Sequence, residues 1–366
     1  MKFSCSQMEL NAALQIVSKV VSNKTTLPAL TGILFDATKN ELRLVGNDLN
    51  IMIETTIEAN IQKKGAAVIP SGFITELVRK LPPSEIHFTL DEKGDVSIEC
   101  AQLSYKILSY NSNDYPERVF DGAKTRFHVP KDELARMIRQ TKYAISKEES
   151  RPTLTGALFE LEGNMFTMVA IDGFRMAISK LPLQTDLHTK FIVPEKALND
   201  VLRLIGGLDQ EEDVAIEFTE QQVKFLFGKT NLYSTLIAGE FTNYRKILPS
   251  ESKIYFRLPL ASLVDSIDRS ILVVRENKNQ AIRLDITDEQ LEITSNSEVG
   301  NSKEVIPIRL EGDNLTIGFN PKYLMDSLKA IDAEEIELKF TNNIGPCTIT
   351  STEHDRYLYL LLPTRL

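Results

Sequence analysis

The sequence predicts an α+β protein built from three repeats of one domain, each with two helices packed on a mostly antiparallel sheet. Three observations predict this fold class: one segment recurs at a fixed offset, the chain is 366 residues long, and the same order of helical and alternating segments appears three times. Because single hydrophobic cores stop growing well below this length, two or three domains are expected.

The recurring segment decides between two domains and three. Residues 26–54 align with residues 150–178 without a gap, at an offset of 124, and ten of the 29 positions are identical. Ordinary composition would give roughly two identities by chance. The chain has therefore been built by duplication, and an offset of this size favours three domains.

Each repeat is expected to open with a short strand and a helix. Residues 1–5 form the first strand, and residues 6–9 (SQME) have the form of a capping box for a helix that ends near residue 22. In the second repeat Pro130 is expected as the first helical residue. In the third, Pro259 precedes an amphipathic segment that extends to about Asn277.

A second helix and further strands follow in every repeat. Pro70, Pro194 and Pro321 each lie seven residues ahead of an apolar residue in the second helix. Segments that alternate apolar and polar residues, such as 291–294, are typical of half-buried strands. Two helices would cover one face of the sheet in each repeat. The expected domains are 1–122, 123–250 and 251–366.

Composition limits the classes of protein that the chain can be. With 42% hydrophobic and 25% charged residues it is ordinary for a folded protein. The absence of a long apolar segment predicts a cytoplasmic location without membrane association. Three widely spaced cysteines provide neither a disulfide framework nor zinc-ligand spacing. The net charge of −9 argues against a simple nucleic-acid binder, which normally needs a basic excess.

No catalytic motif is found. Residues 228–230 (GKT) match the end of a phosphate-binding loop, but Val223 stands where that motif requires its first glycine. We interpret residues 228–230 as a turn between two strands. The four histidines are isolated, and no nucleophile elbow is present. The sequence therefore predicts no enzyme, no cofactor and no metal site.

The basic residues are more informative. Arg136, Arg139 and Lys142 are spaced to lie on one side of a helix, opposite its apolar residues. A charged outer face is normal for a single amphipathic helix, but basic residues recur on the other five predicted helices. If all six helices line one side of the assembly, an acidic protein can present a basic inner surface to a polyanion.

Short motifs along the whole chain resemble the bacterial sliding clamps, the beta subunit of DNA polymerase III. The motifs are MKF at 1–3, TLPAL at 26–30, NDL at 47–49, DGFR at 172–175, YRKILP at 244–249, IGFN at 317–320 and LPTRL at 362–366. The resemblance implies a head-to-tail homodimer that closes into a ring of six domains, with helices facing the hole and sheets outside. Such a ring catalyses nothing; it encircles double-stranded DNA without sequence specificity and tethers the polymerase by raising its effective concentration.

The resemblance also implies three sets of site residues and a range of partners. Phosphate contacts are expected at Lys24, Arg79, Lys147, Arg151 and Lys196, in addition to Arg136, Arg139 and Lys142 from their spacing. A hydrophobic cleft for partner peptides is expected at Leu154, Ile171, Gly173, Phe174, Arg175, Met176, Thr242, Lys246, Ile247, Asn320, Tyr323, Leu360, Leu361, Leu362, Pro363, Thr364, Arg365 and Leu366. Ring closure is expected to join Leu77, Tyr105 and Ile107 to Ile271 and Leu272 of a second copy.

The expected partners are the catalytic subunit of the replicative polymerase, the clamp loader, and repair and translesion polymerases. Phe174 stands where many members have histidine, and Thr242 where many have proline, so the preferred peptide stays open. The main rival interpretation is a peptide-binding scaffold of the same fold that does not encircle DNA.

Overall fold

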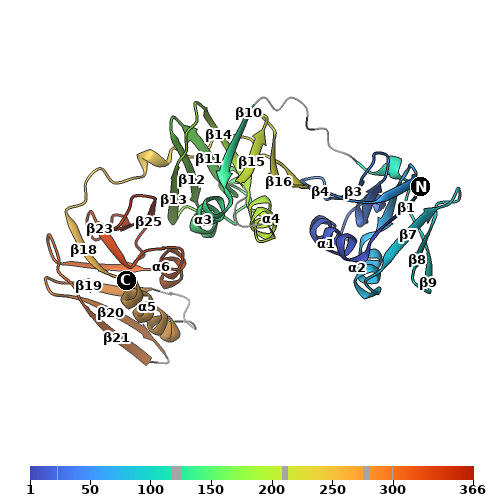
Figure 1. Ribbon diagram of the computed structural model, residues 1–366. Helices are drawn as coiled ribbons and strands as arrows, with labels where there is room; N and C mark the ends of the chain where they lie inside the picture. Colours follow the sequence, from blue (N-terminus) through green and yellow to red (C-terminus); the bar gives the residue numbers. More distant parts are fainter. Residues whose placement is uncertain (23, 117–119, 121–124, 208–212, 275–280, 299) are drawn as a thin grey trace. The chain divides into compact units, whose positions relative to one another are not determined.

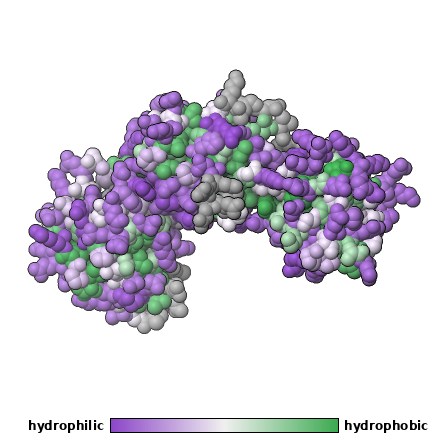
Figure 2. Space-filling view, in the orientation of Figure 1, coloured by the Kyte–Doolittle hydropathy of each residue, from purple (hydrophilic) through white to green (hydrophobic). Residues whose placement is uncertain are grey.

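The computed structural model describes residues 1–22, 24–116, 120, 125–207, 213–274, 281–298 and 300–366 (Figure 1). The chain packs as two compact units. Unit 1 comprises Met1–Lys131 with Asn199–Leu236, and unit 2 comprises Asp132–Leu198 with Ile237–Leu366. Figure 2 shows hydrophilic residues over most of the visible face of either unit, with hydrophobic residues in small separate areas.

Unit 1 contains two antiparallel sheets, one of five strands and one of eight. The five-stranded sheet has the order β5 (Asn60–Lys63), β1 (Lys2–Ser6), β7 (Glu85–Leu90), β8 (Asp95–Cys100), β9 (Leu103–Leu108). The eight-stranded sheet has the order β10 (Thr125–Pro130), β15 (Asp213–Phe218), β16 (Gln222–Phe227), β17 (Thr230–Thr235), β4 (Ile51–Ile57), β3 (Leu42–Asn47), β2 (Gly32–Asp36), β6 (Ala66–Pro70).

Unit 2 repeats this plan with an eight-stranded and a four-stranded sheet. The larger sheet has the order β14 (His188–Pro194), β11 (Gly156–Glu162), β12 (Met165–Ile171), β13 (Arg175–Pro182), β25 (Tyr357–Leu361), β24 (Cys347–Ser351), β23 (Glu335–Phe340), β18 (Ile254–Pro259). The smaller has the order β21 (Gly300–Pro307), β20 (Gln290–Ser297), β19 (Ile282–Ile286), β22 (Leu315–Phe319).

Each eight-stranded sheet joins strands of two successive repeats. In unit 1 the junction is the β4–β17 pair, where Met52 lies opposite Tyr233. In unit 2 it is the β13–β25 pair, where Met176 lies opposite Leu360. Repeats that follow one another in the chain therefore share a sheet.

Helices cover the sheets within each unit. The described α-helices are α1 (Gln7–Val17), α2 (Ser71–Lys80), α3 (Lys131–Thr141), α4 (Glu195–Ile205), α5 (Leu260–Val274) and α6 (Pro321–Leu328). Single 3-10 turns are η1 (Ser18–Val20), η2 (Pro28–Thr31), η3 (Ser112–Asp114), η4 (Lys142–Ala144), η5 (Pro152–Leu154) and η6 (Tyr244–Lys246). In unit 1, α1 packs beside α2 and buries Leu10, Leu14 and Val17 (Figure 1).

The predicted order of strand, helix, strands, helix, strands is confirmed in each repeat. The capping box is wrong, because the Ser6 side chain makes no cap hydrogen bond. The amide of Gln7 instead donates to the carbonyl of Ser84 at 3.1 Å, which satisfies an amide at the helix start. Pro130 is the last residue of β10, paired with Asp213, so α3 starts one residue later than predicted.

Two predictions fall where the structure gives no description. The expected helix end at Asn277 and the domain boundary between residues 122 and 123 lie outside the described residues. The described part of α5 ends at Val274.

The glycine shared by the two copies of the repeated segment marks a close approach of strands. A Cβ atom at Gly32 would lie 2.9 Å from the carbonyl oxygen of Ile69, and one at Gly156 would lie 2.4 Å from that of Val193. Any larger residue would push β2 from β6, or β11 from β14. The duplicated glycine therefore serves the fold.

Candidate peptide cleft and nucleic-acid interface

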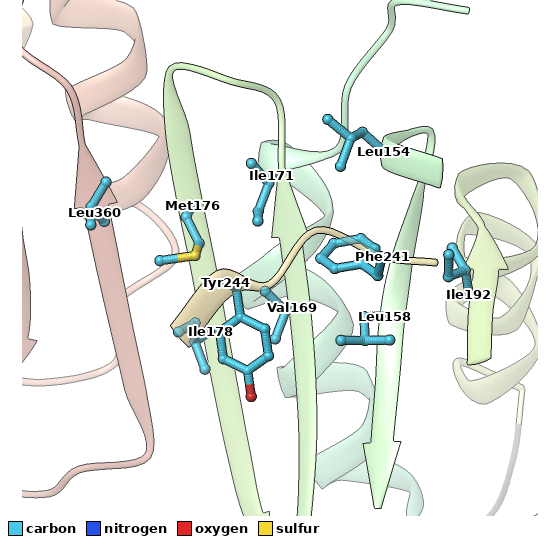
Figure 3. Packing of buried hydrophobic residues seen from close by; sticks show 10 residues of the cluster. All are labelled: Leu154, Leu158, Val169, Ile171, Met176, Ile178, Ile192, Phe241, Tyr244 and Leu360. Carbon is cyan, nitrogen blue, oxygen red and sulfur yellow. The ribbon is translucent and has the colours of Figure 1, made fainter. Parts of the chain in front are cut away.

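A cluster of buried apolar side chains lies on one face of the eight-stranded sheet of unit 2. Alternate residues such as Ser179 point to the opposite face, where Ser179 contacts Arg136 of α3. The segment 237–248 crosses the strands and adds Phe241 and Tyr244 to the cluster (Figure 3). We call this set the cleft cluster: Leu154, Leu158, Val169, Ile171, Met176, Ile178, Ile192, Phe241, Tyr244 and Leu360.

Hydrogen bonds hold the segment 237–248 against the sheet. The amide of Ile237 donates to the carbonyl of Ile192 at 3.0 Å. The Tyr244 hydroxyl donates to Glu160 at 2.6 Å, and the Arg245 guanidinium donates to both oxygens of the same carboxylate at 3.0 and 2.8 Å. Burial and the hydrogen bond to Glu160 raise the pKa of Tyr244, so its hydroxyl remains a donor at neutral pH.

The predicted cleft residues divide into a buried floor and an exposed rim. Leu154, Ile171, Met176 and Leu360 belong to the cleft cluster, and Leu361 is also buried. Gly173, Thr242, Lys246, Thr364 and Arg365 are exposed, and Asn320, Tyr323 and Pro363 are partly buried. The exposed apolar side chains are Phe174 (59%), Ile247 (37%), Leu362 (43%) and Leu366 (63%).

The turn that carries Phe174 is fixed by Asp172. Its carboxylate accepts hydrogen bonds from the amides of Phe174 and Arg175 at 2.9 and 3.0 Å. Gly173 has a φ of 95°, a left-handed conformation that favours glycine. The turn therefore presents the Phe174 ring outward, where it stacks on Tyr323 at a centroid distance of 5.9 Å.

Arg175 is committed to contacts within the chain. Its guanidinium donates to Asp172 at 2.9 Å, to Asp326 at 2.7 Å and to the Tyr143 carbonyl at 2.7 Å. Tyr143 and Tyr323 also lie against it, at 5.1 and 4.4 Å from the ring centroids. Burial alone would lower the pKa of Arg175, but its bonds to the two carboxylates outweigh this and raise it. Arg175 thus ties β13 to α6.

The C-terminal tail continues the rim beside β22. The amide of Leu362 donates to the Phe174 carbonyl at 2.9 Å, and that of Thr364 donates to the Gly318 carbonyl at 2.9 Å. A Cβ atom at Gly318 would lie 2.7 Å from Leu366, which shows how closely the tail packs there. The Asn320 side chain caps α6 by accepting from the amide of Lys322 at 3.0 Å.

The predicted basic residues occupy different environments. All five N–H donors of Arg136 are used: two donate to Glu133, and the others to Gln140, Ser179 and the Lys180 carbonyl. Its side chain is only 15% exposed. Spacing alone did not predict this structural role.

The other basic residues of unit 2 are more accessible. Arg139 and Lys196 are exposed, and Lys142 is half-buried. The side chain of Lys147 is 75% exposed and pairs with Glu195, and that of Arg151 is 57% exposed. In unit 1, Lys24 is exposed, and Arg79 pairs with Glu76 at 2.8 Å on the outside of α2.

Family models match the chain from end to end. They describe the DNA polymerase III beta subunit: its N-terminal domain matches residues 1–119, its central domain 128–243 and its C-terminal domain 245–365. The chain belongs to this family, the sliding clamps. A beta sliding clamp from Staphylococcus epidermidis is 33% identical over 358 residues, which cover 95% of this chain and 94% of that protein.

Solved sliding clamps have the same fold. The DNA polymerase sliding clamp from Bacillus subtilis has a TM-score of 0.96 and 31% identity, covering 100% of this chain and 99% of that chain. A sliding clamp from Bartonella birtlesii, bound to griselimycin, has a TM-score of 0.93 and 26% identity, covering 100% of both chains. The fold class is therefore three clamp domains of helices on antiparallel sheet.

Membership of the sliding-clamp family gives the function. This chain is a DNA polymerase processivity factor that acts in DNA replication with DNA and polymerase as partners, and the family has no catalytic activity. Gly228 and Lys229 form the turn between β16 and β17 as interpreted, with a φ of 56° at Gly228, but Thr230 is the first residue of β17 and not part of the turn. Among the described residues, no helix could span a membrane, and no group of three metal-ligating side chains occurs.

Four of the five residues predicted for ring closure of the clamp lie on an edge strand or on a helix that packs on one. Tyr105 and Ile107 are half-buried on β9, an edge strand of unit 1, and Leu77 is half-buried on α2. In unit 2, Ile271 is half-buried and Leu272 is 62% exposed on α5, which packs on the edge strand β21.

Several apolar residues at the sheet edges and in the cleft cluster were not singled out from the sequence. Leu108 on β9 is 74% exposed and Val305 on β21 is 48% exposed, so both free edges carry additional apolar side chains. The sequence of β9, LSYKIL, places apolar residues on both faces of a strand, which is a signal that was available. Phe241 and Tyr244 of the cleft cluster were also missed.

Proposed function

We propose that two copies of this chain associate head to tail into a ring that encircles duplex DNA without sequence specificity. The observation that carries the proposal is the match of three clamp-domain models in order along the whole chain. The free edges β9 and β21 support it, because an exposed edge with apolar side chains is suited to pairing with another chain. Leu77, Tyr105 and Ile107 would then meet the second copy's Ile271 and Leu272.

Within the ring, basic side chains would contact DNA phosphates. The proposed contacts are Lys24, Arg79, Arg139, Lys142, Lys147, Arg151 and Lys196. Arg136 is left out because its five donors are already satisfied by the protein. Phosphate contacts carry no sequence information, so they hold DNA without stopping it from sliding. A basic inner surface also reconciles DNA binding with a net charge of −9.

We also propose that the exposed rim around the cleft cluster binds short peptides of partner proteins. An apolar floor beside Phe174, Ile247, Leu362 and Leu366 offers pockets for apolar side chains. The expected partners are the replicative polymerase catalytic subunit, the clamp loader, and repair and translesion polymerases. Arg175 contributes by holding the turn of Phe174 against α6, as its contacts indicate.

The remaining assignments complete this proposal. The domains are 1–122, 123–250 and 251–366, and the site of action is the cytoplasm.

The test is retention on DNA after loading. A ring is trapped on circular DNA but slides off the ends of linear DNA, so loaded chains should remain on a nicked circle and be lost after linearisation. Equal loss from both templates, with peptide binding intact, would replace the ring by the rival scaffold that binds peptides without encircling DNA. Sedimentation would report the dimer independently.

A further inference from the structure

A polar groove lies on the same sheet face as the cleft cluster, over the strands of the third repeat. On β18, β23, β24 and β25, apolar residues such as Phe256 and Tyr359 are buried on the helix side, and the residues between them face the groove. The groove has a volume of about 570 Å³, within the usual range of ligand sites. Its floor includes Arg257, Glu337, Lys339, Thr348, Thr350 and Leu358, and residues 248–252 form a wall.

The groove is continuous with the cleft. Leu248 and Leu358 line the groove and also pack against the cleft cluster. Thr348 of the groove pairs directly across the sheet with Leu360 of the cluster. Two residues of a strand span about 7 Å. A peptide that occupies the cleft can therefore reach the groove within a few residues.

The floor of the groove presents two exposed cations on a buried carboxylate. Glu337 is 11% exposed and accepts from Arg257 at 3.0 Å and from Lys339 at 2.5 Å. Glu335, two residues along β23, is a second carboxylate that acts on Arg257, so the charges around the floor are balanced. Of the floor residues, however, the two cations are exposed and Glu337 is buried. The acidic wall residue Glu251 is itself paired with Lys253 at 3.9 Å.

Both cations remain accessible above the buried carboxylate. The side chain of Arg257 is 59% exposed, and that of Lys339 is 39% exposed. Arginine has five N–H donors in a planar fork, and only its Nε donates to Glu337. The fork can therefore donate to a second carboxylate, and such charge-assisted bonds are roughly twice as strong as bonds between neutral groups.

We propose that this groove binds an acidic segment of a partner protein, continuous with the peptide held in the cleft. The inference rests on the peptide-binding function proposed above. The acidic side chain would meet Arg257 and Lys339, and the hydroxyls of Thr348 and Thr350 would face the bound segment. Affinity for clamp partners would then depend on residues that flank the apolar peptide core.

A phage-displayed library of random dodecapeptides, selected on the full chain, tests this inference. Clones that bind the wild-type chain but not a variant lacking residues 362–366 depend on the cleft. We expect these clones to carry Asp or Glu beside an apolar core. By fluorescence anisotropy, Arg257→Gln or Lys339→Gln should weaken such a peptide about tenfold. Each single variant leaves Glu337 one cation, and an unchanged Tm would show that the fold is intact.

Two controls separate the possible outcomes. Arg283→Gln removes an arginine of similar exposure, 52%, which pairs with Asp285 on another sheet, and it should leave the affinity unchanged. The peptide with its acids changed to Asn or Gln should bind wild type and Arg257→Gln equally. If the cleft-dependent clones lack acidic residues beside the apolar core, the groove proposal is wrong while the cleft stands. The same follows if their affinity is unchanged in both Arg257→Gln and Lys339→Gln. A library without cleft-dependent clones would overturn the peptide cleft and the groove together.

Discussion

Arg136 and Arg139 lie three residues apart on α3, and we predict opposite effects for their substitutions. Arg136→Ala removes five hydrogen bonds, including a pair to Glu133 at 2.9 and 2.6 Å. Breaking a buried charge pair costs about 3–5 kcal/mol. That figure is reduced here because Arg136 is 15% and Glu133 29% exposed, and because Glu133 keeps Arg356 as a second partner at 3.8 Å. We expect Arg136→Ala to lower the free energy of unfolding by about 2–4 kcal/mol.

The reason for this loss is the set of acceptors that Arg136 leaves behind. Gln140 and Ser179 are buried, and each loses a charged donor, although the Ser179 hydroxyl still donates to Gln140 at 2.8 Å. The Ser179 oxygen loses the donor that Arg136 supplies, and an unsatisfied buried acceptor costs about 1–3 kcal/mol. Unit 2, which contains Arg136, has about 200 residues. For a unit of this size, the expected loss of unfolding free energy lowers Tm by roughly 5–15 °C in a thermal melt. DNA retention by the folded fraction should be unchanged.

Arg139→Glu should behave in the opposite way. The side chain is exposed on the same helix, so Tm should change by an amount equivalent to less than about 0.5 kcal/mol. Losing one phosphate contact per subunit should shorten residence on circular DNA and reduce the salt slope by about 0.9 for each contact. A normal Tm with shortened residence for Arg136→Ala would refute the assignment of its donors. Unchanged residence for Arg139→Glu would remove this residue from the DNA surface.

Three further predictions concern the tail, the ring and acid stability. Deleting residues 362–366 should abolish peptide binding measured by anisotropy while the chain remains a dimer, because these residues supply exposed rim side chains; unchanged binding would contradict the cleft. Changing Ile271 and Leu272 to Asp should give monomers by sedimentation, and a persistent dimer would place the interface elsewhere. Burial alone would raise the pKa of Glu54, but hydrogen bonds from Tyr233, Asn231 and Arg43 lower it in the folded state. The ionised Glu54 therefore stabilises the fold above pH 4.5, and this stabilisation is lost as pH falls through the folded-state pKa. Glu54→Gln should therefore flatten the dependence of Tm on pH below about pH 5, and parallel curves would contradict this.

The order of elements could be predicted from the sequence because hydrophobic periodicity and proline placement are local signals. Strand pairing is different. The junction of β4 with β17 joins Met52 to Tyr233, which are far apart in the sequence, and no local pattern selects that partner. The same limit explains why Phe241 was missed: it enters the cleft cluster only because residues 237–248 cross strands from the preceding part of the repeat.

The candidate site could be predicted in part for a similar reason. Helical spacing placed Arg136 and Arg139 near one another, but it does not say which of them turns toward the neighbouring strand. Arg136 reaches Ser179 of β13, a contact 43 residues away in the sequence. Arg175 was predicted at the cleft and lies there, but its partner Asp326 comes from another repeat. Predicting its structural role would have required the tertiary contacts.

The duplicated segment forms similar buried apolar clusters in unit 1 and unit 2, but the surfaces over the two clusters differ. Unit 1 contains a buried cluster whose members lie 124 residues before those of the cleft cluster at five positions: Leu30, Leu34, Val45, Met52 and Val68. The turn is repeated too, since Asp48 accepts from the amides of Asn50 and Ile51 as Asp172 does from its own neighbours.

The two copies differ in the side chains that lie over these shared apolar residues. In unit 1, Tyr233 lies across from Met52 and donates to Glu54 at 2.6 Å, and Tyr115 donates to the Val45 carbonyl at 3.0 Å. These hydroxyl bonds fix Tyr233 and Tyr115 against the first cluster, as the bond to Glu160 fixes Tyr244 in the cleft cluster. In unit 2 the corresponding strand carries Leu360, which makes no such bond, and it leads directly into the exposed tail. Duplication therefore explains the apolar floor, and the exposed rim of the second copy is where a partner peptide can bind.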